Sequence, residues 1–501
     1  MRMRQAALTG EKARGGAAAF GLGIVAAAGQ APLGLWPLAL LGFAGLIALV
    51  LPAATPQRAA KLAWMGGAGY FGAALVWIVQ PFLVDIARHG WMAPFALGLM
   101  AFGLALFWAV AGYAAARFTQ RPGLRCAALV LMLTVAELAR SYVLTGFPWA
   151  LIGHLWIGTP VMQLAAVTGP HGLTLLALLA AALPVALRTR GAVLALVLVA
   201  AAWGYGAWQL TRPIPPREAA PVVRLLQPNA AQHLKWRDDL VPVFLRRQLA
   251  LTAEFSDPAP DLIVWPETAV PYLLGQAEPV LKMISDASGG RPAILGIQRR
   301  DGRRVFNALA AIGAGGAVTH VYDKYHLVPF GEYMPLSGFF ARFGIFGLAA
   351  GESFGYAAGP GAQVLDLGAL GKVLPLICYE AIFPQDLRAA PIRADWILQL
   401  TNDAWFGTFS GPYQHLAQAR LRAVEQGLPV LRSANTGVSA VIDARGRVLR
   451  DLPLNTAGQL TAPVPPALPP TLYVRFGDWP AGLAIIVALA ALIYRRFSVS
   501  R

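Results

Sequence analysis

Long, uncharged, apolar stretches before residue 210 limit the folds open to this chain more than any other feature. No charged residue occurs from Gly15 to Gln57. Because a helix needs about 20 apolar residues to cross a bilayer, this stretch has room for two spans, with a turn near residues 30–32. The chain is 57% hydrophobic and only 13% charged, which is too apolar for an ordinary soluble protein. The pattern predicts a membrane protein.

Further apolar segments predict the rest of a membrane domain. Candidate spans follow near residues 60–83, 90–114, 124–144, 163–187 and 191–209, and an eighth, shorter one near residues 479–494. Since apolar segments continue after the first, we interpret the basic N-terminus as the flank of a membrane helix rather than as a cleaved secretory signal. Seven helices are therefore expected before residue 210 and one near the C-terminus.

Lysine and arginine gather in alternate loops between these expected spans. They precede the first span, recur after the second, fourth and sixth, and follow the eighth, whereas the other loops contain little beyond Arg88 and Arg140. Because basic loops stay on the cytoplasmic side, both termini are expected in the cytoplasm. Residues 211–475 are then expected on the periplasmic side of a bacterial inner membrane.

The same distribution explains the formal net charge of +16. Nucleic-acid-binding proteins gather basic residues in a patch or stripe, often with interleaved aromatic residues, and no such stripe is present. No nucleic-acid partner is therefore expected. Cys126 and Cys378 are the two cysteines, and they fall in regions expected on opposite sides of the membrane, so no disulfide is predicted. Cys126 is interpreted as a packing residue.

Proline-rich stretches, TRPIPPREAAP and TAPVPPALPPTL, mark both ends of the segment from 211 to 475. Between them, runs typical of strands alternate with runs typical of helices. Strands are expected in VVRLLQPN, DLIVWPET, AILGIQ, NALAAIG, VLPLICYE, DWILQLTND and GVSAVIDARGRVL, and helices at residues 237–256, 278–288 and 412–427. The pattern predicts an α/β sandwich at 211–475, between a membrane domain at 1–210 and a last helix with its tail at 476–501.

Three polar residues stand at the ends of strand-like runs in this domain: Glu267 in VWPET, Lys324 in YDKYHLVPFGEY and Cys378 in LICYE. A thiol needs a base to become a nucleophile, a carboxylate can be that base, and an ammonium can stabilise the oxyanion of a tetrahedral intermediate. Together the three would form a complete set for acyl transfer. Taken singly, they also fit a turn carboxylate, a solvated surface charge and a buried core thiol.

The motifs around these residues resemble known families. WPE, DKYHLVPFGEY and CYE, in this order, are similar to the nitrilase, or carbon–nitrogen hydrolase, superfamily, whose triad is glutamate, lysine and cysteine. The longer motifs QPNAAQHLKW, KYHLVPFGEYMP and LTNDAWFGTFSGPYQHLAQARLRAVEQGLPVLRSANTG resemble the apolipoprotein N-acyltransferase family. The likeness covers the whole chain and implies a nitrilase-like αββα sandwich inserted between transmembrane helices seven and eight of an eight-helix membrane domain.

The resemblance also implies roles for individual residues. The family's general base, oxyanion stabiliser and nucleophile correspond to Glu267, Lys324 and Cys378. Supporting roles fall to Trp236, Glu332, Tyr379 and Glu380, although each of these also fits a purely structural role. A buried Glu332 close to Lys324 could keep that amine charged, which makes it the best candidate for a second base.

The implied reaction has two half-reactions and needs no cofactor or metal. The Cys378 thiolate would attack an acyl ester of a membrane phospholipid and hold the fatty acid as a thioester. The α-amine of the N-terminal diacylglyceryl-cysteine of an apolipoprotein would then attack the thioester and form an amide. Glu267 would take a proton from the thiol first and from the amine second. The enzyme is expected to act as a monomer.

Residues 335–357 are rich in phenylalanine and almost uncharged. Phe339, Phe340 and Phe343 would suit a lid that dips into the lipid interface, and the glycines and Pro335 at its margins would allow it to move. The alternative is a hydrophobic core segment that folds back into the domain.

Two other functions remain compatible with the sequence. A membrane-tethered amidase would use the same triad and pass the acyl group to water. A non-catalytic scaffold would only bind lipoproteins, although a binding module has no need of this trio. The long motifs outside the triad and the apolar segment at 335–357 favour the transferase.

Overall fold

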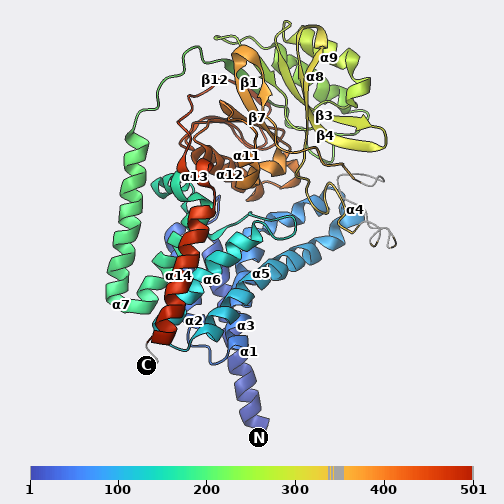
Figure 1. The fold of residues 1–501 in the computed structure, drawn as a ribbon. Coiled ribbons are helices and arrows are strands. Elements are labelled where there is room, and N and C mark those ends of the chain that lie inside the picture. Colours follow the sequence, from blue (N-terminus) through green and yellow to red (C-terminus); the bar gives the residue numbers. More distant parts are fainter. Residues whose placement is uncertain (1, 337–338, 340–341, 343–354, 499–501) are drawn as a thin grey trace. The chain divides into compact units, whose positions relative to one another are not determined.

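The computed structural model describes residues 2–336, 339, 342 and 355–498. The chain forms two compact units, one made of Met1–Arg212 with Thr471–Arg501 and the other of Pro213–Pro470. The first unit is helical, and the second contains sheets and helices (Figure 1).

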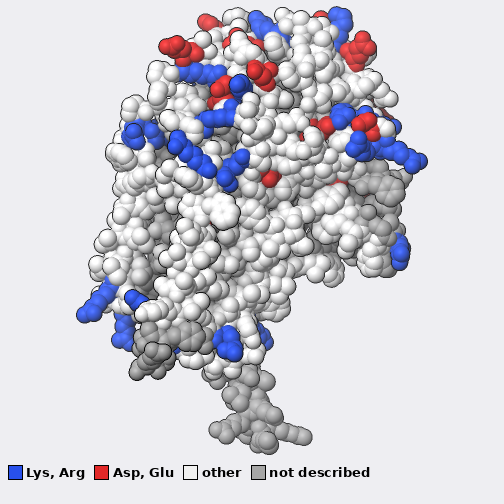
Figure 2. All heavy atoms as spheres, viewed as in Figure 1, with Lys and Arg blue, Asp and Glu red and all other residues white. Residues whose placement is uncertain are grey.

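The helical unit contains long apolar helices. They are α1 (Arg2–Ala27), α2 (Trp36–Val50), α3 (Pro56–Ala74), α5 (Ala93–Phe118), α6 (Pro122–Arg140), α7 (Ala165–Thr211) and α14 (Trp479–Ser498). Shorter helices lie between them, namely η1 (Val76–Leu83), α4 (Ile86–His89), η2 (Gly90–Met92), η3 (Ile152–Trp156), η4 (Pro160–Leu164) and α13 (Leu472–Phe476). Few charged side chains lie along the visible surface of these helices (Figure 2).

Length and composition identify which described helical segments are able to cross a membrane. Three qualify, Ile86–Phe118, Pro122–Arg140 and Pro160–Thr211, and a fourth is present if α3 and η1, which are bent by 49°, form one broken span. Helices α2 and α14 and the part of α1 from Arg14 to Ala27 are apolar but shorter. The chain is therefore a membrane protein, while the arrangement of eight spans stays a prediction.

Helix α7 includes both the sixth and the seventh predicted spans. At Arg188 its backbone leaves the helical region, with φ 54° and ψ −130°, so the helix is kinked there. A Cβ on Gly191 would lie 1.8 Å from the carbonyl oxygen of Leu183, so only glycine permits this close approach. The two predicted spans thus lie on either side of a sharp bend rather than of a loop.

A buried ion pair organises the segment between α6 and α7. Arg140 and Glu137, at the end of α6, are 2.8 Å apart and fully buried. Their remaining polar atoms bond the backbone of Phe147, Trp149, Ala150 and Ile152 and the indole of Trp108. Because backbone groups in an apolar environment need partners, this pair stabilises the irregular chain that follows α6.

A second buried cluster in the helical unit has the contacts of a serine-hydrolase triad. Ser141 Oγ lies 3.1 Å from His171 Nε2, and His171 Nδ1 lies 2.9 Å from Asp478. Ser141 is fully buried, however, and its hydroxyl donates to the carbonyl oxygen of Glu137. Tyr142 also donates to Asp478. The cluster therefore ties the start of α14 to α6 and α7 rather than offering a nucleophile.

The second unit is built from two six-stranded sheets. The first has the order β12-β1-β2-β3-β4-β5, from β1 (Val222–Gln227), β2 (Leu262–Val264), β3 (Ala293–Asp301), β4 (Arg304–Ile312), β5 (Val318–Asp323) and β12 (Gly458–Pro463). The second has the order β11-β10-β9-β8-β7-β6, from β6 (Leu365–Asp366), β7 (Lys372–Ile377), β8 (Trp396–Thr401), β9 (Val430–Ala434), β10 (Ser439–Ile442) and β11 (Val448–Leu452). Parallel pairs join β1, β2 and β3 in one sheet and β7, β8 and β9 in the other.

Helices cover the outer face of each sheet. Helices α8 (Val241–Ala253) and α9 (Glu278–Ala287) share a core with the first sheet, whereas α11 (Pro384–Arg388) and α12 (Gly411–Gln426) share one with the second (Figure 1). The inner faces meet directly, because Ser433 on β9 donates to the carbonyl oxygen of Leu226 on β1. The unit is an αββα sandwich, so the predicted nitrilase-like α/β fold is confirmed.

The observed strands extend the predicted set. Strands β5, β6, β9 and β12 lie outside the predicted runs, and GVSAVIDARGRVL, predicted as one strand, covers β10, the turn after it and only the first two residues of β11. The apolar pattern does not predict β9, because the polar residues Arg432 and Ser433 interrupt the apolar run. Both residues are fully buried, and their side chains form hydrogen bonds to other parts of the chain. β12 is a sheet edge that ends in Pro463, which is typical of edge strands.

We expect Arg140→Met to lower the free energy of unfolding by about 3–5 kcal/mol, because it leaves the buried Glu137 carboxylate without its cation. Denaturation of the detergent-solubilised protein measures this. Arg117→Met, at an exposed arginine near the end of α5, is the control and is expected to stay within about 0.5 kcal/mol of the original protein. Equal losses in the two variants would contradict the role of the ion pair.

Candidate active site

The carboxyl ends of parallel strands from both sheets carry polar residues. Glu267 follows β2, Cys378 follows β7 and Asn402 follows β8. The backbone N–H of Asn402 donates to Glu267 Oε2 at 2.7 Å, which joins the ends of the two sheets. Ligand sites of α/β folds commonly lie at this edge.

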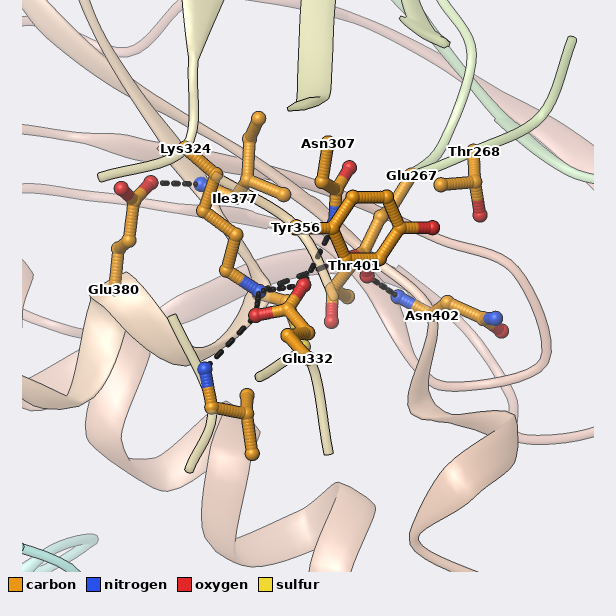
Figure 3. Close-up of polar contacts among 12 residues, drawn as sticks. Glu267, Thr268, Asn307, Lys324, Glu332, Tyr356, Ile377, Glu380, Thr401 and Asn402 are labelled. Carbon is orange, nitrogen blue, oxygen red and sulfur yellow. Dashed lines mark hydrogen bonds and ion pairs between the residues drawn. The ribbon is translucent and has the colours of Figure 1, made fainter. Parts of the chain in front are cut away.

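Lys324, directly after β5, lies between two carboxylates (Figure 3). Its Nζ is 2.9 Å from both carboxylate oxygens of Glu332 and 3.8 Å from Glu267 Oε1. Asn307 Nδ2 on β4 donates to both carboxylates, at 2.7 Å to Glu267 and 3.0 Å to Glu332. All four side chains are buried. The structure thus brings Glu267, Lys324 and Glu332 into one hydrogen-bonded group.

Their pKa values move in ways that suit acid–base chemistry. Burial alone would lower the pKa of Lys324, but the charges of Glu332 and Glu267 outweigh it and the pKa is raised. Burial raises the pKa of Glu267, while Lys324 and the hydrogen bond from Asn307 oppose the rise and Glu332 adds to it. Lys324 therefore stays an ammonium, and Glu267 accepts a proton more readily than an exposed glutamate does.

Cys378 stands at the junction between β7 and the short helix η9 (Cys378–Ile382). Its φ is +50°, in a region that non-glycine residues rarely adopt. Strain of this kind, about 1–3 kcal/mol, is often stored at catalytic residues. Its carbonyl oxygen accepts hydrogen bonds from His415 Nε2 at 3.0 Å and Gln399 Nε2 at 3.3 Å. These bonds hold the strained residue in place.

The thiol of Cys378 is electrostatically coupled to the carboxylate and the amine. Burial raises the pKa of the thiol, the negative charge of Glu267 raises it further, and Lys324 opposes both. The side chain is 5% exposed. The thiol therefore keeps its proton at neutral pH, so it needs a base before it can attack.

Glu380 is occupied by structural hydrogen bonds. It accepts bonds from the Tyr322 hydroxyl at 2.9 Å and from the backbone N–H groups of Tyr325, His326 and Ile377, at 2.9, 3.3 and 2.7 Å. Burial raises its pKa to about 7, against these donors. Glu380 thus joins the segment after β5 to the end of β7. Its neighbour Tyr379 is buried and packs edge-on against Phe383 and His326.

Trp236 and Phe339 are not part of this hydrogen-bonded group. Trp236 is 43% exposed and lines an open hollow, whose other walls include Lys235, Phe244, Pro266 and Asn435. Phe339 is 55% exposed. Phe340 and Phe343 lie outside the described residues.

Several polar residues of the site were not singled out from the sequence. Asn307 and Asn402 bond Glu267, and the buried set of Asp403, His415 and Arg432 supports the backbone of Cys378. Burial alone would raise the pKa of Asp403, but Arg432 and His415 lower it to about 2. The sequence signal that could have found most of them is a polar residue within or shortly after an apolar strand, but His415 lies on α12 and has no such signal. Among the described residues, no group of three or more His, Cys, Asp or Glu could hold a metal ion.

The pH dependence of Cys378 alkylation is expected to move in opposite directions in two variants. Cys126, buried in α6, is first replaced by alanine so that Cys378 is the only thiol. Glu267→Gln removes a charge that raises the thiol pKa, so iodoacetamide should react at lower pH. Lys324→Met removes a charge that lowers that pKa, so the profile should move to higher pH. Mass spectrometry across a pH series measures both, and shifts in one common direction would contradict the coupling.

The two parts of the chain match two known protein families. Residues 223–468 match the carbon-nitrogen hydrolase family, and residues 22–183 match the apolipoprotein N-acyltransferase N-terminal domain. A nitrilase-superfamily amidase from Nesterenkonia aligns with 55% of this chain and 98% of its own chain at 19% identity, with a TM-score of 0.36.

Relatives with a curated name align with almost the whole chain. The apolipoprotein N-acyltransferase of Rhodopseudomonas palustris is 37% identical in an alignment that is 507 positions long. This alignment covers 95% of this chain and 94% of that one. The protein of the same name from Brucella melitensis is 39% identical over 504 residues, with the same coverage of both chains. The chain therefore belongs to the apolipoprotein N-acyltransferase family.

Proposed function

We propose that this chain transfers a fatty acyl group to the N-terminal α-amine of a lipoprotein precursor. The observation that carries this proposal is the identity of 37–39% with enzymes of that name over 95% of the chain. The match includes the helical unit as well as the α/β unit, so it concerns the transferase as a whole and not only a hydrolase-like domain.

In the first half-reaction, Glu267 takes the proton of the Cys378 thiol. The thiolate attacks the ester carbonyl carbon of an acyl donor, and the Lys324 ammonium stabilises the oxyanion that forms. The intermediate collapses to a thioester on Cys378, and the departing alcohol takes the proton back from Glu267. The raised pKa values of both the thiol and Glu267 suit this exchange.

In the second half-reaction, the α-amine of the acceptor attacks the thioester carbonyl. Glu267 takes a proton from the amine, the C–S bond breaks, and the thiolate of Cys378 leaves as the amide forms. Glu267 then returns its proton to the sulfur, so the enzyme is regenerated. Glu332, which contacts Lys324 more closely than Glu267 does, keeps the amine charged through both steps.

The apolar helices suit a donor and an acceptor that both have acyl chains. The donor in this proposal is a membrane phospholipid, and the acceptor has an N-terminal diacylglyceryl-cysteine. The α/β unit would face the periplasm of a bacterial cell, with both termini in the cytoplasm, eight spans and a single chain as the active form. The basic loops of the sequence support this orientation.

An amidase that transfers the acyl group to water is the nearest rival. It would use the same three residues, so they do not discriminate between the two. The match of residues 22–183 to the N-terminal domain of the acyltransferase family favours transfer to an amine. A scaffold without activity would have no use for a buried lysine between two carboxylates beside a strained cysteine.

Cys378→Ala should abolish both the acyl adduct and the transfer, whereas Cys126→Ala should leave both unchanged. The protein is incubated with phospholipid vesicles, and intact mass spectrometry measures the mass added to the chain. A diacylglyceryl lipopeptide is then added, and its N-acylation is measured in the same way. Persistent lipopeptide acylation by Cys378→Ala would contradict the assignment of the nucleophile, and acyl release to water alone would favour the amidase.

Phe339→Ala should weaken the use of phospholipid more than the use of a short soluble ester, because an interfacial aromatic residue helps only with a donor in the bilayer. Phe255→Ala, at a phenylalanine that is 89% exposed in the same unit, is the matched control and should change neither rate. Rates of thioester formation with each donor test the prediction. Equal losses with both donors would reject the lid.

A further inference from the structure

A buried lysine outside the predicted triad contacts the segment that carries Glu267. Lys235 Nζ donates to the carbonyl oxygen of Glu267 at 3.2 Å and to Thr268 Oγ1 at 3.0 Å. Lys235 is only 7% exposed, and its Nζ lies 5.1 Å from the ring centroid of Trp236. Burying an ammonium costs free energy, and the hydrogen bonds of Lys235 that offset this cost go to the single turn at Glu267 and Thr268.

The turn that Lys235 contacts is strained and tightly packed. Thr268 has a φ of +46°, a region that β-branched residues avoid. On β3, a Cβ at Gly296 would lie 2.2 Å from the carbonyl oxygen of Pro266 and 2.6 Å from Glu267 Cα. The Gly296 carbonyl oxygen also accepts hydrogen bonds from Ala269 and Val270. The turn is therefore fixed by β3 through Gly296 and by the ammonium of Lys235.

This turn sets the direction of the Glu267 carboxylate. One oxygen accepts from Asn307 Nδ2 and the other from the backbone N–H of Asn402, each at 2.7 Å. A small rotation of the turn would break both bonds. The positive charge of Lys235 also lowers the pKa of Glu267, against the larger effect of burial.

We propose that Lys235 is a positioning residue for the general base: its ammonium fixes the Glu267–Thr268 turn, so that the Glu267 carboxylate keeps the geometry that Asn307 and Asn402 define. The inference rests on the proposed function, because it concerns the base of that reaction. Lys235 touches neither the thiol nor the amine of Lys324 in this arrangement, so it acts through Glu267.

Lys235→Met keeps the aliphatic stem but removes the charge and the donors. The rate of thioester formation on Cys378 of the full-length protein in phospholipid vesicles should fall about 10- to 100-fold at neutral pH. The acid limb of the pH–rate profile should also move to higher pH. The sign follows because loss of a nearby positive charge raises the pKa of Glu267, so the base becomes protonated at a higher pH.

Lys235→Arg retains the charge and should return the acid limb to its original position. Lys282→Met is the matched control, because Lys282 is exposed on α9 and pairs with the exposed Asp286, and it should change neither the rate nor the profile. Thr268→Val removes one acceptor of the ammonium and should lower the rate severalfold with a smaller shift. This variant decides the matter if Lys235→Met does not fold, as judged by circular dichroism.

A uniform loss of rate at every pH in Lys235→Met, with the acid limb unmoved, would overturn the inference and leave Lys235 a purely structural residue. An unchanged rate in Thr268→Val would also count against it. Neither result affects the proposed function, which fails only if the original protein forms no thioester or acylates no lipopeptide.

Discussion

A lysine ammonium as deeply buried as that of Lys324 is costly unless nearby carboxylates compensate its charge, and this constraint shapes the whole site. Lys324 is 1% exposed, and the carboxylates of Glu332 and Glu267 lie within 2.9 and 3.8 Å of its Nζ. Asn307 then bonds both carboxylates, because two negative groups this close need a shared donor. The group holds charges of both signs in a buried environment of low dielectric constant, where each charge has a large effect on a reacting atom.

The same group depends on the packing of the two sheets against each other. Glu267 comes from the first sheet, and one of its oxygens is bonded by the backbone of Asn402 from the second. Glu380, beside Cys378, reaches back to the backbone of Tyr325, beside Lys324. Neither sheet provides all the residues of the site. A substitution in the interface between the sheets therefore affects the thiol even when the substituted residue contacts none of the reacting groups.

The sequence predicts the residues whose type reveals their chemistry, but not the residues whose importance comes from their contacts. Glu267, Lys324 and Cys378 stand out because charged or nucleophilic groups end apolar runs. Asn307 and Lys235 do not, since an amide within a strand and a lysine in a loop are common, and only the tertiary structure places them against Glu267. The sequence does predict a break near Arg188, between the spans at 163–187 and 191–209, but not that a kinked helix joins the two spans in place of a loop.

The last strand of the α/β unit, β12, pairs with its first strand, β1. β12 pairs with β1 along its whole length, with Pro463 opposite Val222, and occupies the edge beside it. During translation, the ribosome therefore synthesises every residue of the site before it synthesises β12, the strand that pairs with β1. Pairing between such distant segments forms slowly. A chain truncated before β12 would leave the β1 edge open to association with other nascent chains.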